Sequence, residues 1–126
     1  MSRAGRRRIR CILVAVAIAC LVAAPGNAGD AFLPAFGDLP LMEGLAPVAD
    51  SETVFDTPAG RIVEAYAAGT VSRERAERFY ATTLPQLGWR RQTAHVFRRE
   101  EESLTIEYRQ KGKTLTVRFM LAPARR

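Results

Sequence analysis

A single histidine, His95, is the most versatile chemical group in this chain of 126 residues. As a general base it would need a nucleophile within hydrogen-bond reach and an acidic group to orient its ring. The serines beyond residue 28 are Ser51, Ser72 and Ser103, and none lies in the strand–turn–helix setting of a nucleophile elbow. We therefore predict that the chain has no catalytic residue and is not an enzyme.

Three consecutive glutamates, Glu100–Glu102, form the densest group of carboxylates. Carboxylates that work as an acid–base pair are held at a fixed separation, whereas three neighbours in a turn point in divergent directions. A zinc site needs three or four ligands, and the only cysteines are Cys11 and Cys20 near the N-terminus. We predict a solvated turn with no metal and no cofactor, and weak calcium binding is the alternative.

Arginines cluster after the expected helix and recur in the last two expected strands, with Trp89 and Phe97 beside two of the pairs. Guanidinium groups interleaved with aromatic rings suit phosphate-bearing partners, and on an exported protein those partners are anionic lipids or acidic polymers. The alternative is an ordinary solvated sheet edge that discourages strand pairing. The candidate residues of this anionic-partner patch are Arg90, Arg91, Arg98, Arg99, Arg109 and Arg118.

The N-terminus has the three parts of a secretory signal peptide. Arginines dominate residues 3–10, an unbroken apolar run covers 11–24, and small residues precede a cleavage site after Ala28. At 1.5 Å per residue the apolar run spans roughly 21 Å, short of the roughly 30 Å of a bilayer core. We predict a periplasmic or secreted protein, with a lipoprotein anchored through Cys20 as the less favoured alternative. Export also argues against nucleic acid as a partner.

Removal of residues 1–28 changes the charge of the chain. The whole sequence has 19 Lys and Arg against 13 Asp and Glu, and five of the arginines lie in the signal peptide, so the exported chain is nearly neutral. Residues 29–57 contain six acids and no Lys or Arg, together with several prolines and apolar residues. We interpret this segment as an arm that packs on its own domain. The alternative is an arm that docks on a partner through Phe32, Phe36, Leu39, Leu41 and Met42.

The elements expected after this arm follow the order β-α-β-β-β. Residues 61–68 alternate as a strand, and Ser72 is a good N-cap for an amphipathic helix that Pro85 should break or kink near residues 83–84. Gly88 supplies the stop before Trp89. Three strands joined by short turns follow, the last two meeting at Gly112. We predict an α+β domain over 58–123, a two-layer sandwich with one amphipathic helix on a mostly antiparallel four-stranded sheet, and a tail over 124–126.

Several short motifs resemble a group of small exported proteobacterial proteins. Phe79-Tyr80 and Leu84-Pro85-Gln86-Leu87-Gly88-Trp89 match its "FY…LPxLGW" helix end, and Phe97-Arg98-Arg99-Glu100 matches the strand that follows. This resemblance implies the same antiparallel strands after the helix and a location in the cell envelope. It supplies no activity and no catalytic residue.

These observations together predict a non-enzymatic binding or scaffolding module of the periplasm. Its expected partner is an envelope protein or an anionic lipid or polymer, and it meets the membrane only through the signal peptide or lipidation. The alternative function is an accessory subunit that docks on a membrane or protein partner through residues 32–45.

Overall fold

The computed structural model of this chain describes residues 32–125. The predicted signal peptide, its cleavage after Ala28 and the alternative lipidation of Cys20 lie outside the described residues. Within residues 32–125, no helix is both long and apolar enough to cross a membrane. The described part consists of one α-helix, a short 3-10 turn and one β-sheet.

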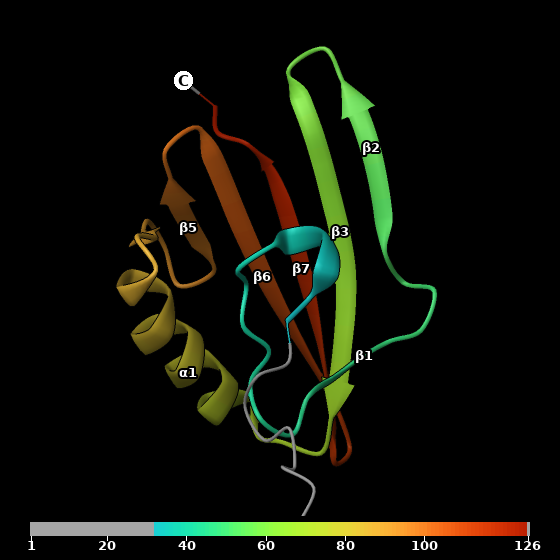
Figure 1. The fold of residues 1–126 in the computed structure, drawn as a ribbon. Coiled ribbons are helices and arrows are strands. Elements are labelled where there is room, and N and C mark those ends of the chain that lie inside the picture. The colour runs from blue at the N-terminus through green and yellow to red at the C-terminus, as the bar shows by residue number, and fades with distance from the viewer. Residues whose placement is uncertain (1–31, 126) are drawn as a thin grey trace, which may run out of the picture.

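An antiparallel sheet of seven strands forms the body of the domain (Figure 1). Its main path runs in the order β1, β3, β7, β6, β5, β4, and β2 lies beside β3 at the same edge as β1. Every pair of neighbouring strands is antiparallel. The strands are β1 (Ala46–Pro47), β2 (Thr53–Thr57), β3 (Gly60–Gly69), β4 (Arg90–Arg91), β5 (Val96–Arg99), β6 (Glu102–Lys111) and β7 (Thr114–Pro123).

The α+β class and the mostly antiparallel sheet are confirmed, but the predicted number of four strands is wrong. The four expected strands correspond to β3, β5, β6 and β7, and the sequence reading missed β1, β2 and β4. Strands β1 and β4 have two residues each, too few for an alternating pattern to appear. Strand β2 lies at the sheet edge with both faces exposed, so no apolar alternation marks it.

Alternation along the three long strands separates two faces of the sheet. On β3, Val63, Ala65 and Ala67 are buried, while Ile62 and Tyr66 point to the other face and stay half-buried. Strands β6 and β7 continue the buried side of the sheet with Leu104, Ile106, Leu115, Val117 and Phe119. The side chains of this covered face form the core together with the helix and the N-terminal segment.

Helix α1 (Arg73–Gln86) lies against the β6–β5–β4 side of the covered face (Figure 1). The Ser72 hydroxyl caps it by accepting a hydrogen bond from the Arg75 N–H at 3.2 Å, as predicted. The predicted break before Pro85 is wrong, because the helix continues to Gln86. Pro85 lies in the last turn, where its missing N–H removes a single intrahelical bond. Gly88 then ends the turn with φ +88°.

The N-terminal segment 33–45 covers the rest of the same face and belongs to the core. Leu33, Phe36, Leu39, Leu41, Met42 and Leu45 are all buried there. The Tyr80 hydroxyl of α1 donates to the Pro40 carbonyl at 3.0 Å and accepts from the Met42 N–H at 3.4 Å. Helix α1 and this segment thus form one layer, and the sheet forms the other.

Candidate binding surface on the uncovered face of the sheet

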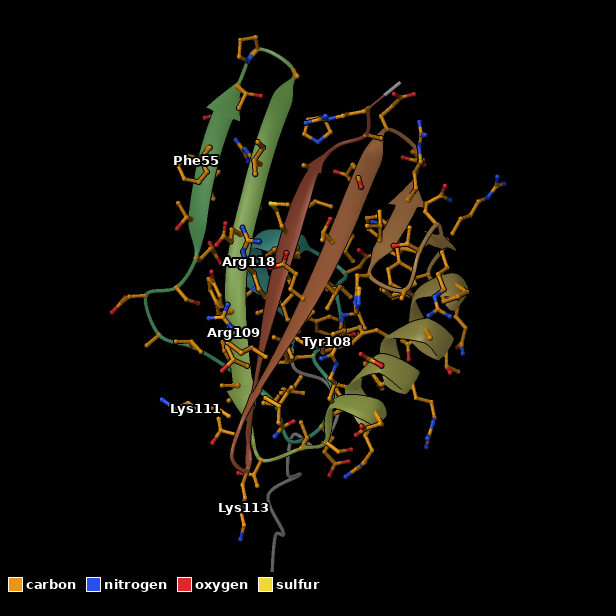
Figure 2. The ribbon with its side chains drawn as sticks, turned by 180° about the vertical axis from the view of Figure 1, so that it is seen from behind. Phe55, Tyr108, Arg109, Lys111, Lys113 and Arg118 are labelled. Carbon is orange, nitrogen blue, oxygen red and sulfur yellow. The ribbon has the colours of Figure 1, made fainter. Side chains whose placement is uncertain are left out.

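The opposite face of the sheet has no helix or loop packed on it in the part of the chain that the structure describes (Figure 2). We call this surface the uncovered face. Its central positions come from the strands that build the core, one residue out of phase with the buried ones. They are Ile62, Glu64 and Tyr66 of β3, Thr116, Arg118 and Met120 of β7, and Thr105, Glu107 and Arg109 of β6.

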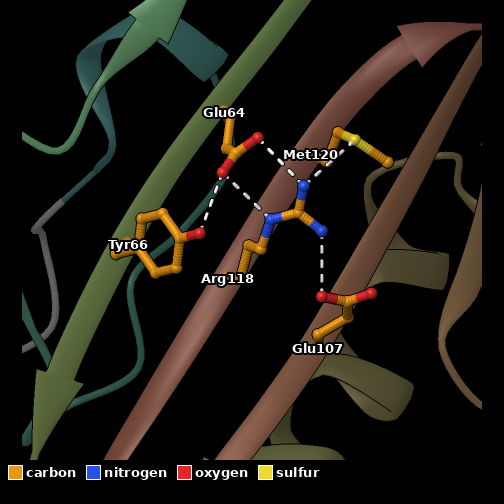
Figure 3. Close-up of polar contacts among 5 residues, drawn as sticks. All are labelled: Glu64, Tyr66, Glu107, Arg118 and Met120. Carbon is orange, nitrogen blue, oxygen red and sulfur yellow. Dashed lines mark hydrogen bonds and ion pairs between the residues drawn. The ribbon is translucent and has the colours of Figure 1, made fainter.

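An ion-pair network organises the centre of this face (Figure 3). Arg118 binds Glu64 with two hydrogen bonds, from Nε to Oε1 at 3.0 Å and from Nη2 to Oε2 at 2.9 Å. Its Nη1 donates to Glu107 Oε2 at 2.9 Å. The Tyr66 hydroxyl donates to Glu64 Oε1, also at 2.9 Å. One guanidinium therefore joins carboxylates from both neighbouring strands and fixes their orientation.

The charges of this network shift the titration of its members. The hydrogen bonds from Arg118, followed by that from Tyr66, hold the pKa of the Glu64 carboxyl below its ordinary value. The same contacts raise the pKa of Arg118, and the bond to Glu64 raises the pKa of the Tyr66 hydroxyl. Glu64 therefore stays ionised at neutral pH, which suits a fixed charge better than a proton carrier.

A shallow hollow of about 390 Å³ lies beside the network. Tyr66, Glu107, Arg109, Thr116 and Arg118 line it, together with Tyr108. Beyond the hollow, the β6–β7 hairpin carries the exposed bases Arg109, Lys111 and Lys113 toward the tip of the sheet (Figure 2). This end of the uncovered face is basic.

The other end of the uncovered face is mixed. A second hollow of about 460 Å³ lies there, and we call the apolar side chains in its lining, Ile62, Val96, Met120 and Ala122, the apolar strip. Gln92, Arg98, Ser103, Thr105 and Arg125 line the same hollow. Phe55 stands directly opposite Ile62 on β2 and extends the strip to the sheet edge. The uncovered face thus combines a half-buried apolar area with a fixed charge network.

The six arginines predicted as one anionic-partner patch fall into two groups. Arg90, Arg98 and Arg99 line one hollow at the β4–β5 edge, where Arg90 stands opposite Arg98 and Arg91 stands opposite the buried Phe97. Arg109 and Arg118 line the hollow beside the network, where two carboxylates hold Arg118. Arg98 stands opposite Ser103, six positions along β6 from Arg109, so the two groups do not form one continuous basic surface.

Arg99, the sixth arginine, is already bound within the domain. It donates to both carboxylate oxygens of Asp38, at 2.7 and 3.1 Å, and to the Leu87 carbonyl at 3.1 Å. Its guanidinium lies 4.3 Å from the centre of the Trp89 ring. The hydrogen bonds from Arg99 lower the pKa of the Asp38 carboxyl. They also link the N-terminal segment to the end of α1.

The residues predicted as a docking arm do not form an exposed surface. Phe36, Leu39, Leu41 and Met42 are buried in the domain's own core, and only Phe32 of that set is exposed, at 48%. Phe36 packs edge-on against the Phe119 ring, with 6.2 Å between centroids. The interpretation of this segment as an arm that packs on its own domain therefore agrees with the structure, whereas docking through these residues does not.

His95 and the glutamate turn lie apart from the network. The His95 ring is half-buried 5.9 Å from the Tyr108 ring, and its main-chain N–H donates to the Thr93 hydroxyl. Glu100 adopts a left-handed φ of 53° in the turn between β5 and β6. Within residues 32–125, no group of three metal-binding side chains converges.

The sequence reading missed Glu64 and Glu107 as members of a site. A detectable signal for Glu64 was that it is the only acid in its strand, between the apolar Val63 and Ala65 and two positions from Tyr66. A comparison of the chain with protein-family models, with curated proteins and with solved structures found no match. The resemblance to small exported proteobacterial proteins stays a prediction.

Proposed function

We propose that this protein is a non-enzymatic binding module of the cell envelope, and that it binds its partner through the uncovered face of the sheet. One observation carries the proposal: α1 and the N-terminal segment close one face of the strands, and nothing within residues 32–125 packs on the other face. That uncovered face carries a preorganised Glu64–Arg118–Glu107 network next to the apolar strip.

The composition of residues 1–28 supports a location in the periplasm. A basic head, an apolar run and small residues before Ala28 are the features of a cleaved signal peptide. The exported form would then comprise residues 29–126. Attachment to a membrane through Cys20 is the alternative, in which case the domain acts at a lipid surface.

A protein partner fits this surface better than an anionic lipid or polymer. Arg99 and Arg118 already bind carboxylates of their own domain. Neighbouring exposed bases occur at the hairpin end, with Arg109, Lys111 and Lys113, and at the β4–β5 edge, where Arg90 stands opposite Arg98. The apolar strip and the fixed charges beside it favour a folded protein surface with complementary shape and charge.

A pair of matched variants tests this function. Thr116→Arg places a long side chain in the hollow of the uncovered face, and Thr82→Arg places the same side chain on the exposed side of α1. Immobilised residues 29–126 should retain a specific protein from envelope extract. The Thr116→Arg variant should lose that protein, and the Thr82→Arg variant should keep it.

Two results would contradict the proposal. Equal retention of the protein by both variants would mean that it binds somewhere other than the uncovered face. Retention of lipid vesicles or acidic polymer, with no protein retained, would mean that the partner is not a protein. Circular dichroism of both variants, expected to match that of the parent, separates loss of binding from loss of the fold.

A further inference from the structure

Strand β2 carries exposed apolar side chains at the edge of the sheet. It pairs with β3 on one side, and no described strand pairs with its other side (Figure 1). Val54 is 45% exposed and Phe55 is 52% exposed. Together with Val48 they account for three of the four large apolar side chains exposed within residues 32–125. The edge at β2 is therefore both unpaired and apolar.

The two edges of the sheet differ in how they discourage pairing. On the far edge, β4 is two residues long and both are arginines. On the same edge as β2, β1 is two residues long and contains Pro47. Short strands, prolines and basic residues are the usual protection of an edge. Strand β2 is longer and has a β-branched residue and an aromatic one at its centre. It lacks that protection and suits the addition of another strand.

Hydrogen bonds on β3 show which way its main-chain groups point. The Tyr66 carbonyl accepts from the Val48 N–H at 2.9 Å, and the Tyr66 N–H donates to the Ser51 hydroxyl at 3.1 Å. The main-chain groups of Tyr66 therefore face the side of β3 where β1 and β2 lie. Because alternate residues of a strand face the same side, those of Glu64 and Ile62 face β2 as well.

The orientation of the β3 main chain determines which N–H and C=O groups of β2 point away from the sheet. Thr53 lies opposite Glu64 and Phe55 opposite Ile62, so these two residues turn their main-chain groups toward β3. Val54 and Asp56, which alternate with them, turn their N–H and C=O groups away from the sheet. An extended peptide segment is the ligand whose own N–H and C=O groups match that spacing.

The charge around β2 indicates what kind of segment fits. Glu52 and Asp56 lie on the same side of the strand as Val54, and Asp50 precedes them. A single weak contact, 3.4 Å from Arg61 to Asp56, offsets this charge, and its side chains are 67% and 80% exposed. A second copy of the same strand would bring more carboxylates to the edge, so a basic segment is the better partner.

We propose that the outer edge of β2 binds an extended segment of a partner protein, which adds to the sheet as an antiparallel strand. The segment has apolar side chains opposite Val54 and Phe55 and basic side chains opposite Glu52 and Asp56. This inference rests on the proposed binding function and deepens it, because Phe55 connects the edge to the apolar strip of the uncovered face.

A blocked hexapeptide, Thr-Lys-Phe-Val-Thr-Lys, is the probe for this edge. In antiparallel register its Phe and Val stand opposite Phe55 and Val54, and its lysines stand opposite Asp56 and Glu52. Added to residues 29–126, it should slow amide hydrogen exchange at Val54 and Asp56 and leave Thr82 on α1 unchanged. The same peptide with glutamates in place of lysines should bind about tenfold more weakly.

Main-chain pairing has its own matched control in the peptide. N-methylation of its Val removes a donor that faces β2 and should abolish binding. N-methylation of its Phe alters an amide that faces away and should leave binding within about threefold. In the protein, Glu52→Lys combined with Asp56→Lys should reverse the preference in favour of the glutamate peptide.

Three outcomes would overturn the inference. They are no binding of the lysine peptide, equal effects of the two N-methylations, and a β2-to-β2 dimer of the protein that excludes the peptide. If envelope protein is still retained and Thr116→Arg still prevents it, the uncovered-face function stands and only the assignment of β2 fails. If the lysine peptide binds but Thr116→Arg does not affect retention, the uncovered-face assignment fails instead.

Discussion

The two faces of the same three strands carry opposite kinds of side chain. The covered face of β3, β7 and β6 presents apolar residues that pack against α1 and the N-terminal segment. The uncovered face presents, one residue out of phase, a network of two carboxylates and one guanidinium beside a half-exposed apolar strip. The difference separates two roles: one face supplies the stability of the domain, and the other is the face that we propose binds a partner.

The largest expected effect comes from a pair of neighbours on β7 that point to opposite faces. Phe119 is fully buried, with its ring centroid 5.4 Å from that of Tyr80, whereas Met120 is half-exposed. Phe119→Ala should lower the free energy of unfolding by about 3–5 kcal/mol, because it leaves a cavity between the layers. Met120→Ala should lower it by less than about 1 kcal/mol. Urea unfolding of residues 29–126 measures both, and equal losses would contradict the division between the faces.

Two tyrosines provide the next comparison. The Tyr80 hydroxyl bonds both Pro40 and Met42 in the interior, and the Tyr66 hydroxyl bonds Glu64 on the uncovered face. Tyr80→Phe should cost about 1–3 kcal/mol, because it leaves a carbonyl and an N–H of the N-terminal segment without a partner.

Tyr66→Phe is the control for that change. Glu64 keeps its two bonds from Arg118, so the cost should stay within about 0.5 kcal/mol. Urea unfolding measures the free energy of unfolding of both variants. Amide exchange at Met42 should become faster in Tyr80→Phe and stay unchanged in Tyr66→Phe. A larger cost for Tyr66→Phe than for Tyr80→Phe would mean that the network within the sheet contributes more to stability than the hydrogen bonds between the two layers.

The ion pairs of the network should contribute less to stability than the buried bonds of Tyr80. Arg118→Met removes two partly exposed ion pairs, with Glu64 and with Glu107, and it should lower the free energy of unfolding by about 1 kcal/mol or less at neutral pH. Because the folded pKa of Glu64 lies below its unfolded value, this contribution is present above the unfolded pKa. It disappears as the pH falls through the folded pKa.

The stability difference between Arg118→Met and the parent should therefore shrink in acid. Urea unfolding at neutral and at acidic pH checks this, with Arg109→Met as a control from the same face that has no pH-dependent deficit. A deficit that grows in acid would mean that Glu64 is not the group that Arg118 stabilises.

The covered face explains why much of the fold could be predicted. Strands β6 and β7 and helix α1 bury one side each, so period-two and helical patterns appear directly in their sequences. Ser72 and Gly88 marked the helix ends correctly because each acts through local geometry. Pro85 misled the prediction because its effect depends on how much helix follows it.

The uncovered face explains why the candidate site could not be predicted. Glu64, Glu107 and Arg118 are distant in sequence, and only the register of β3, β7 and β6 brings them together. The same register carries Arg109 and Arg118 away from the arginines of β4 and β5. Strand β2 left no pattern because neither of its faces is buried. A surface that the domain itself does not bury leaves little trace in the periodicity of its sequence.

Site-specific photo-crosslinking shows whether a partner protein contacts the uncovered face of the sheet. A photoreactive amino acid replaces Thr116 on the uncovered face in one preparation of residues 29–126 and Thr82 on α1 in another. Each is irradiated in envelope extract, and crosslinked proteins are identified by mass spectrometry. We expect one dominant protein adduct from position 116 and none from position 82. Equal adducts from both positions, or adducts from position 82 alone, would contradict it.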